Sequence, residues 1–74
     1  MKLRCLTTPK TLNMFTANKV YPNIILTPKS NSKSGSMRAI NDKGKVNIGR
    51  YYIYNGDVMF LGCKFRIIAE NKLN

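Results

Sequence analysis

The sequence predicts an all-β protein, a small barrel of five to six short antiparallel strands that forms a single domain over residues 1–74. Three observations predict it. Apolar residues come in short runs, several of which alternate with polar residues, and turn residues separate these runs. No stretch of ten residues has helical periodicity. A chain of this length has one small core.

The first strand is expected at residues 2–7, where Leu3 and Cys5 alternate with Lys2 and Arg4. A break follows at residues 9–13, and residues 14–19 are expected to form a tight turn in which Asn18 takes a left-handed conformation. A second strand is expected at residues 20–27. Proline lacks an N–H group, so Pro22 indicates an edge position or a bulge near the start of that strand.

Residues 28–36 are polar and of low complexity, which predicts a flexible basic loop carrying Lys29 and Lys33. Two interpretations are open: a finger that contacts phosphates, or a tolerated extension between two strands. A third short strand is expected at residues 37–40. A turn at residues 41–44 then ends with Gly44.

The longest strand is expected at residues 45–54, with a bulge or bend at Gly49. Asn55-Gly56 is the strongest local signal, because a two-residue hairpin loop requires positive φ angles. Counting outward from it predicts cross-strand partners in the following order: Tyr54 with Asp57, Ile53 with Val58, Tyr52 with Met59, Tyr51 with Phe60, and Arg50 with Leu61.

This register separates two faces of the hairpin. The face suited to the core holds Tyr51, Ile53, Val58 and Phe60, and the opposite face holds Arg50, Tyr52, Tyr54, Asp57, Met59 and Leu61. Aromatic rings beside an arginine can stack on nucleobases and contact phosphates. The same residue types are enriched in protein interfaces. Internal packing is the third interpretation of this second face.

The C-terminal part is expected to bend at residues 62–64 and to end in a strand at residues 65–69. In that strand Phe65, Ile67 and Ala69 face one way, and Arg66 and Ile68 face the other. Residues 70–74 are expected to form a loose tail.

Charge is the main functional signal. The chain has 13 Lys and Arg residues against 3 Asp and Glu residues, a formal net charge of +10, and no histidine. A basic surface attracts polyanions, so nucleic acid is the expected partner. Tyr52 and Tyr54 are expected to stack on bases. Phosphate contacts are expected from the following residues: Lys2, Arg4, Lys19, Lys29, Lys33, Arg38, Lys43, Lys45, Arg50, Lys64 and Arg66.

The sequence shows no catalytic constellation, and we predict neither an enzyme nor a cofactor. Histidine is absent, and Asp42, Asp57 and Glu70 have no obvious partner. Cys5 and Cys63 cannot complete a zinc site alone and are expected to be reduced, half-buried thiols, although a bridge between terminal strands is possible in principle. Without a signal peptide or membrane span, we expect a cytoplasmic, monomeric protein that does not bind membranes.

Four segments resemble a known family. They are Leu3-Arg4-Cys5-Leu6, residues 15–21 (FTANKVY), residues 39–45 (AINDKGK) and Phe65-Arg66-Ile67-Ile68. Together they resemble the small SH3-like β-barrel proteins of tailed bacteriophages and their hosts, which have a strand with cysteine, an FT-x-G-K-x-Y turn, an I-x-D-x-G turn and a closing F-x-I/V strand. The chain departs from this pattern at Asn18, where the family has glycine, and in residues 51–62.

The resemblance implies an SH3-like barrel and a phage-encoded accessory protein acting in the bacterial cytoplasm. Combined with the charge, it leads us to expect a host-takeover protein that binds DNA or RNA with little sequence readout. The alternative is an inhibitor that docks a host protein on Arg50, Tyr52, Tyr54, Met59 and Leu61, with nucleic acid as a possible bridge.

Overall fold

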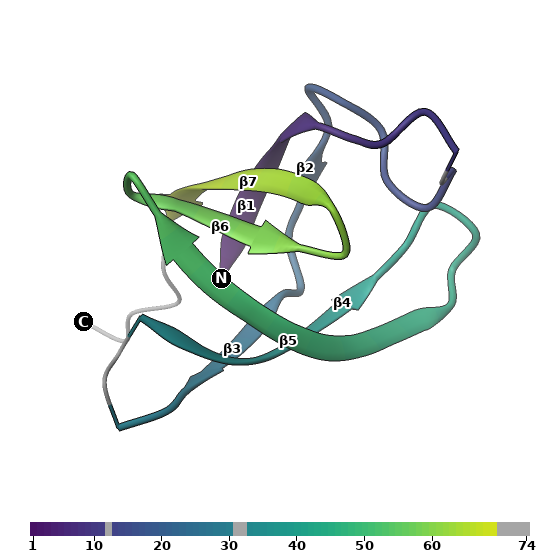
Figure 1. The fold of residues 1–74 in the computed structure, drawn as a ribbon. Helices are drawn as coiled ribbons and strands as arrows, with labels where there is room; N and C mark the ends of the chain where they lie inside the picture. The colour runs from purple at the N-terminus through teal and green to yellow at the C-terminus, as the bar shows by residue number, and fades with distance from the viewer. Residues whose placement is uncertain (12, 31–32, 70–74) are drawn as a thin grey trace.

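The fold is a single antiparallel sheet of seven strands. A computed structural model describes residues 1–11, 13–30 and 33–69, and no helix occurs among them, hence none that could cross a membrane. The strands are β1 (Lys2–Thr7), β2 (Val20–Tyr21), β3 (Ile25–Pro28), β4 (Ser34–Ile40), β5 (Val46–Tyr54), β6 (Asp57–Phe60) and β7 (Cys63–Ala69). Figure 1 shows the sheet wrapping around on itself. The predicted all-β fold is confirmed, with seven strands in place of five or six.

The segment from β2 to β3 closes the barrel. The strands are ordered β2-β1-β7-β6-β5-β4-β3, so β2 and β3 are the two edges of the sheet, yet only residues 22–24 separate them along the chain. β2 pairs with β1, and β3 pairs with β4. Residues 20–27 were expected to form one strand interrupted at Pro22. The interruption is complete, because the chain stops pairing with β1 at Tyr21 and begins to pair with β4 at Ile25.

Two expectations about the middle of the chain are wrong. The loop predicted at residues 28–36 is shorter, because Pro28 pairs with Gly35 and β4 begins at Ser34. The β4–β5 register continues through Gly49 without a shift, so of the predicted bulge or bend the bulge is absent. Gly49 instead leaves room for a core ring, since a Cβ atom there would lie 3.3 Å from Cε1 of Phe60, a tight contact.

Two hairpins connect β5, β6 and β7. Asn55 and Gly56 have φ angles of 51° and 80°, and the register around them is the predicted one from Tyr54–Asp57 to Tyr51–Phe60. The expected partnership of Arg50 with Leu61 is not formed, because β6 ends at Phe60. Leu61 and Gly62 form a second tight turn with φ angles of 52° and 78°.

The bend predicted at residues 62–64 is therefore displaced. The turn occupies residues 61–62, and β7 begins at Cys63 rather than Phe65. The turns predicted around Asn18 and Gly44 are confirmed by φ angles of 70° and 77°. The loose tail predicted at residues 70–74 lies outside the described residues.

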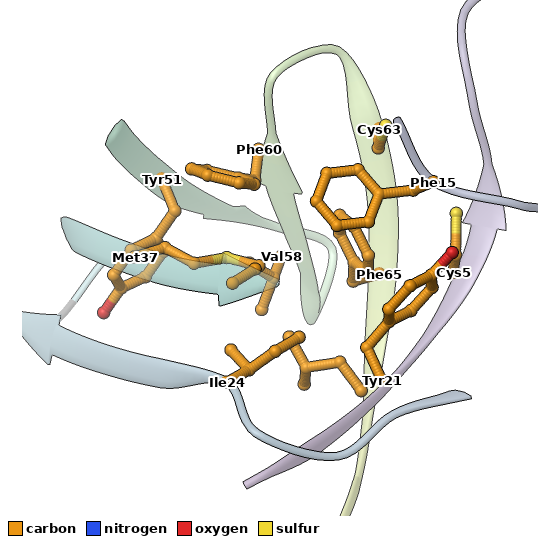
Figure 2. Close-up of a cluster of buried hydrophobic side chains, with 12 residues drawn as sticks. Cys5, Phe15, Tyr21, Ile24, Met37, Tyr51, Val58, Phe60, Cys63 and Phe65 are labelled. Carbon is orange, nitrogen blue, oxygen red and sulfur yellow. The ribbon is translucent and has the colours of Figure 1, made fainter. Parts of the chain in front are cut away.

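The core lies inside the curved sheet and centres on aromatic rings (Figure 2). The ring of Phe15 packs edge-to-face against Tyr21, Phe60 and Phe65 with centroid distances of 5.1, 6.3 and 5.3 Å. Phe15 comes from the segment between β1 and β2, so a loop supplies the centre of the core. Of the four hairpin residues expected in the core, Tyr51, Val58 and Phe60 are buried, and Ile53 is partly buried against them.

Both cysteines belong to this core as free thiols. They are fully buried rather than half-buried. Burial, together with the neighbouring Cys63 thiol, raises the pKa of Cys5 to about 11, and burial also raises the pKa of Cys63. Both thiols are therefore neutral at physiological pH.

Candidate nucleic-acid interface

Strand pairing places a row of side chains across the outer side of the barrel. Tyr54 on β5 faces Asp57 on β6, and Arg66 on β7 faces Arg4 on β1, which in turn faces Val20 on β2. An ion pair joins the two parts of the row, with Nε of Arg66 3.1 Å from Oδ1 of Asp57. The row crosses five strands, a width of roughly 19 Å at the usual strand spacing.

A second row runs beside the first. Tyr52 on β5 lies between Ser34 on β4 and Met59 on β6, and Met59 faces Lys64, which faces Thr7 on β1. The two rows share one side of the sheet, opposite the core. We call the following group the aromatic–basic face: Arg4, Tyr52, Tyr54, Met59, Lys64 and Arg66.

The tyrosines of the aromatic–basic face are accessible. Tyr52 is 53% exposed and Tyr54 is 60% exposed, whereas the preceding residue, Tyr51, is 2% exposed in the core. The interpretation of Tyr52 and Tyr54 as internal packing is therefore wrong. Asp57, expected on this face, is buried, because the guanidinium of Arg66 covers its carboxylate.

Two arginines meet at the middle of the aromatic–basic face. Arg4 and Arg66 are directly opposite each other on β1 and β7, an arrangement in which like charges repel. Asp57 offsets the charge of Arg66 and raises its pKa above the ordinary value. Arg4 donates from Nη1 to the carbonyl of Asn18 at 3.2 Å, which uses one of its five N–H donors. A bound phosphate would relieve the remaining repulsion.

Several other predicted contact residues lie near this face. The amide of Ile53 donates to the carbonyl of Lys33, so the β3–β4 turn, which also carries Lys29, runs beside β5 next to Tyr52. Lys2 is exposed on the same side of β1 as Arg4. Arg50 lies on β5 on the same side as Tyr52, opposite Ser36 of β4.

The remaining predicted residues lie elsewhere. Arg38 on β4 faces Ile25 and Ile48, away from the tyrosines. Lys43 and Lys45 belong to the turn between β4 and β5, at the opposite end of β5 from Tyr54. The ammonium of Lys19 is 2.9 Å from Oδ1 of Asp42, so its charge is already paired. The structure thus divides the predicted contacts among separate surfaces.

Asp42 accepts three side-chain hydrogen bonds, which the sequence did not reveal. Oδ2 accepts from Thr16 Oγ1 at 2.5 Å, and Oδ1 accepts from the Tyr21 hydroxyl at 2.6 Å and from Lys19 Nζ. The bonds from Thr16 and Tyr21, with smaller contributions from Lys19, lower the pKa of Asp42 to about 2. Burial and the bond to Asp42 raise the pKa of Tyr21 to about 12.

A signal for this cluster was present in the sequence. Thr16, Lys19, Tyr21 and Asp42 all occupy positions of the FT-x-G-K-x-Y and I-x-D-x-G patterns. The structure gives these positions a shared role, since one carboxylate fastens the β4–β5 turn to the chain that enters β2. This cluster therefore connects two segments that are distant in sequence.

No group of three or more metal-ligating side chains occurs in the part of the chain that the structure describes. Comparison of the chain with protein-family models, with curated proteins and with solved structures found no match. The chemistry of the surface is therefore the basis for the functional argument.

Proposed function

We propose that this protein binds single-stranded nucleic acid through the aromatic–basic face, by electrostatic attraction and base stacking with little sequence readout. The observation that carries the proposal is the exposure of Tyr52 and Tyr54 in rows that also contain Arg4, Lys64 and Arg66. Stacking on an aromatic ring tolerates every base, and lysine and arginine attract the phosphates between bases.

The spacing of the tyrosines favours an unstacked strand. Tyr52 and Tyr54 are two residues apart on one side of β5, which separates them by about 7 Å. Successive stacked bases are separated by about 3.4 Å. Each ring would therefore receive its own base from a strand whose bases are spread apart, and a duplex could not supply them.

The resemblance to small phage proteins supports a host-takeover or accessory role in a bacterial cytoplasm. The alternative function is inhibition of a host protein, and it uses the same exposed tyrosines. The host protein would dock on the following residues: Arg50, Tyr52, Tyr54, Met59 and Leu61. The two functions differ in how Tyr52 and Tyr54 variants respond to nucleic acid. They can therefore be separated with purified components.

The test is fluorescence anisotropy with labelled single-stranded DNA, single-stranded RNA and duplex DNA at several salt concentrations. We expect binding that weakens steeply with salt, because contacted phosphates release counterions. Tyr52→Ala or Tyr54→Ala should cost about 1–3 kcal/mol for single strands and much less for duplex. Ile48→Ala, which also truncates an exposed residue of β5, is the matched control and should not change binding.

A second pair of variants tests the position of the phosphates. A double variant in which alanine replaces both Arg4 and Lys64 should show a weaker salt dependence of nucleic-acid affinity. A double variant in which alanine replaces both Lys43 and Lys45 loses the same charge but should change the salt dependence little. Equal effects of the two double variants would refute a localised interface. The function would be refuted if the protein bound none of the three nucleic acids at about 50 mM salt. Tyrosine variants with full nucleic-acid affinity would favour the host-protein alternative.

A further inference from the structure

A second exposed surface of the barrel is aliphatic. On the outer side of the sheet, Arg38 of β4 lies between Ile25 of β3 and Ile48 of β5, and in the next row Ile40 of β4 faces Val46 of β5. We call these five residues the aliphatic face. Its apolar members are 52% (Ile25), 71% (Ile48), 37% (Ile40) and 46% (Val46) exposed. Neighbouring exposed aliphatic side chains on three strands are typical of an interaction site.

A pocket opens beside the aliphatic face. It has a volume of about 200 Å³ and lies where the chain leaves β1 to join β4, between residues 19–24 and the end of β4. Its apolar walls include Val20, Pro22, Ile24 and Ile40. Because Ile40 belongs to both the pocket and the aliphatic face, the two form one continuous apolar region. The volume is below the roughly 300 Å³ at which small-molecule sites begin, so the pocket suits one side chain.

The charges around this region identify the chemistry of its partner. Arg38 lies at the centre of the aliphatic face, and Lys43 and Lys45 follow Ile40 in the adjoining turn. A second copy of the chain would bring the same cations together at a net charge of +10 per molecule, which disfavours self-association. Nucleic acid is also disfavoured, because no aromatic ring lies on the aliphatic face to stack with a base.

We propose that the aliphatic face and its pocket bind an acidic segment of another protein, which places one large apolar side chain in the pocket and its carboxylates against Arg38, Lys43 and Lys45. An apolar anchor held in a pocket and surrounded by a charged rim is the usual arrangement of a strong protein interface. This site is separate from the aromatic–basic face, and it stands whether or not the proposed nucleic-acid function is correct.

The test begins with random 12-residue peptides displayed as a library and selected on the immobilised, nuclease-treated protein. We expect the enriched peptides to share one large apolar residue flanked by Asp or Glu. A synthetic peptide of that consensus should shift the methyl NMR signals of Ile25, Ile40 and Ile48, and leave those of Ile67 and Ile68 unchanged. Ile48→Asn should weaken the peptide at least tenfold, because it removes the apolar contact without changing the charge of the aliphatic face.

Controls make each outcome decisive. Ile68→Asn changes another exposed isoleucine, 46% exposed on β7, and should keep both peptide affinity and melting temperature. Tyr52→Ala should keep peptide affinity as well. Enriched peptides without acidic residues, no enrichment, or loss of binding in Tyr52→Ala with retention in Ile48→Asn would each overturn the proposal. So would a dimer in sedimentation that Ile48→Asn dissociates, or displacement of the peptide by vesicles of phosphatidylglycerol.

Discussion

Replacing the Asp42 carboxylate by an amide tests the strongest polar cluster of the fold. In Asp42→Asn the shape of the side chain is kept, but the charge that attracts Lys19 is lost. One oxygen also becomes an NH₂ group, which cannot accept a hydrogen bond from Thr16 or Tyr21. We expect a folded protein of lower stability.

The size of the loss follows from the pKa. A fall from the ordinary 3.8 to about 2 corresponds to roughly 2.5 kcal/mol at 1.36 kcal/mol for each pKa unit. The Asp42 side chain is 23% exposed, so water screens part of this interaction, and we expect about 1–2 kcal/mol. In a domain of this size, each 1 kcal/mol lowers the melting temperature by roughly 4–8 °C.

The pH dependence gives the sharper measurement. Because folding lowers the pKa of Asp42, its carboxylate contributes full stability above pH 3.8, and this contribution disappears as the pH falls toward 2. Urea unfolding followed by circular dichroism at pH 7, 5, 3.5 and 2.5 should show the gap between wild type and Asp42→Asn narrowing only below about pH 4. Thr16→Ser, which keeps the hydroxyl, is the control that should retain most of the stability.

Two results would refute this reasoning. Equal stability of wild type and Asp42→Asn at pH 7 would mean that the three hydrogen bonds contribute nothing measurable. A gap that stays constant down to pH 2.5 would mean that the amide acts through altered packing, since most of the stability that depends on the Asp42 charge should already be lost at that pH.

Three further predictions concern the backbone and the thiols. Gly35→Ala should destabilise the protein by about 1–3 kcal/mol or more in urea unfolding, because its Cβ would lie 2.1 Å from the carbonyl oxygen of Thr27; unchanged stability would contradict the close β3–β4 approach. Gly56→Val should cost about 1 kcal/mol or more through its φ angle of 80° alone, since nothing lies within 4 Å of the new Cβ, and a stable variant would argue against the hairpin. Cys5 and Cys63 should react with a thiol reagent at pH 8 far more slowly in the native state than in urea, because they are buried and their pKa values are raised; equal rates would show that the core opens readily.

Local patterns were sufficient to predict the hairpin from β5 to β6. Asn55-Gly56 fixes the turn and the turn fixes the register, so the core and surface sides of Tyr51 and Tyr52 followed from residues next to each other in sequence. The candidate site depends on the same register. Its tyrosines were therefore predictable, although their exposure was not.

Contacts between distant segments were not predictable in this way. Asp42 had no visible partner because its donors lie 21–26 residues away, on a turn and a two-residue strand that periodicity does not connect to it. Phe15 carried no alternating pattern, yet it is buried at the centre of the core. The aliphatic face was missed for a related reason, since Ile25, Ile40 and Ile48 become neighbours only through the pairing of three strands.

The pairing of β1 with β7 also determines when the barrel can form. β1 begins at Lys2, and its partner on one side is β7, so Leu3 and Cys5 stay uncovered on that side until residues 63–69 have been added. Until then, the hairpins from β3 to β6 are pairings that nearby residues can form. Closure between the two ends of a chain is intrinsically slow, and the exposed strand edges are open to wrong partners in the meantime. The arrival of β7, rather than the completion of any local hairpin, should therefore be the event that permits native folding.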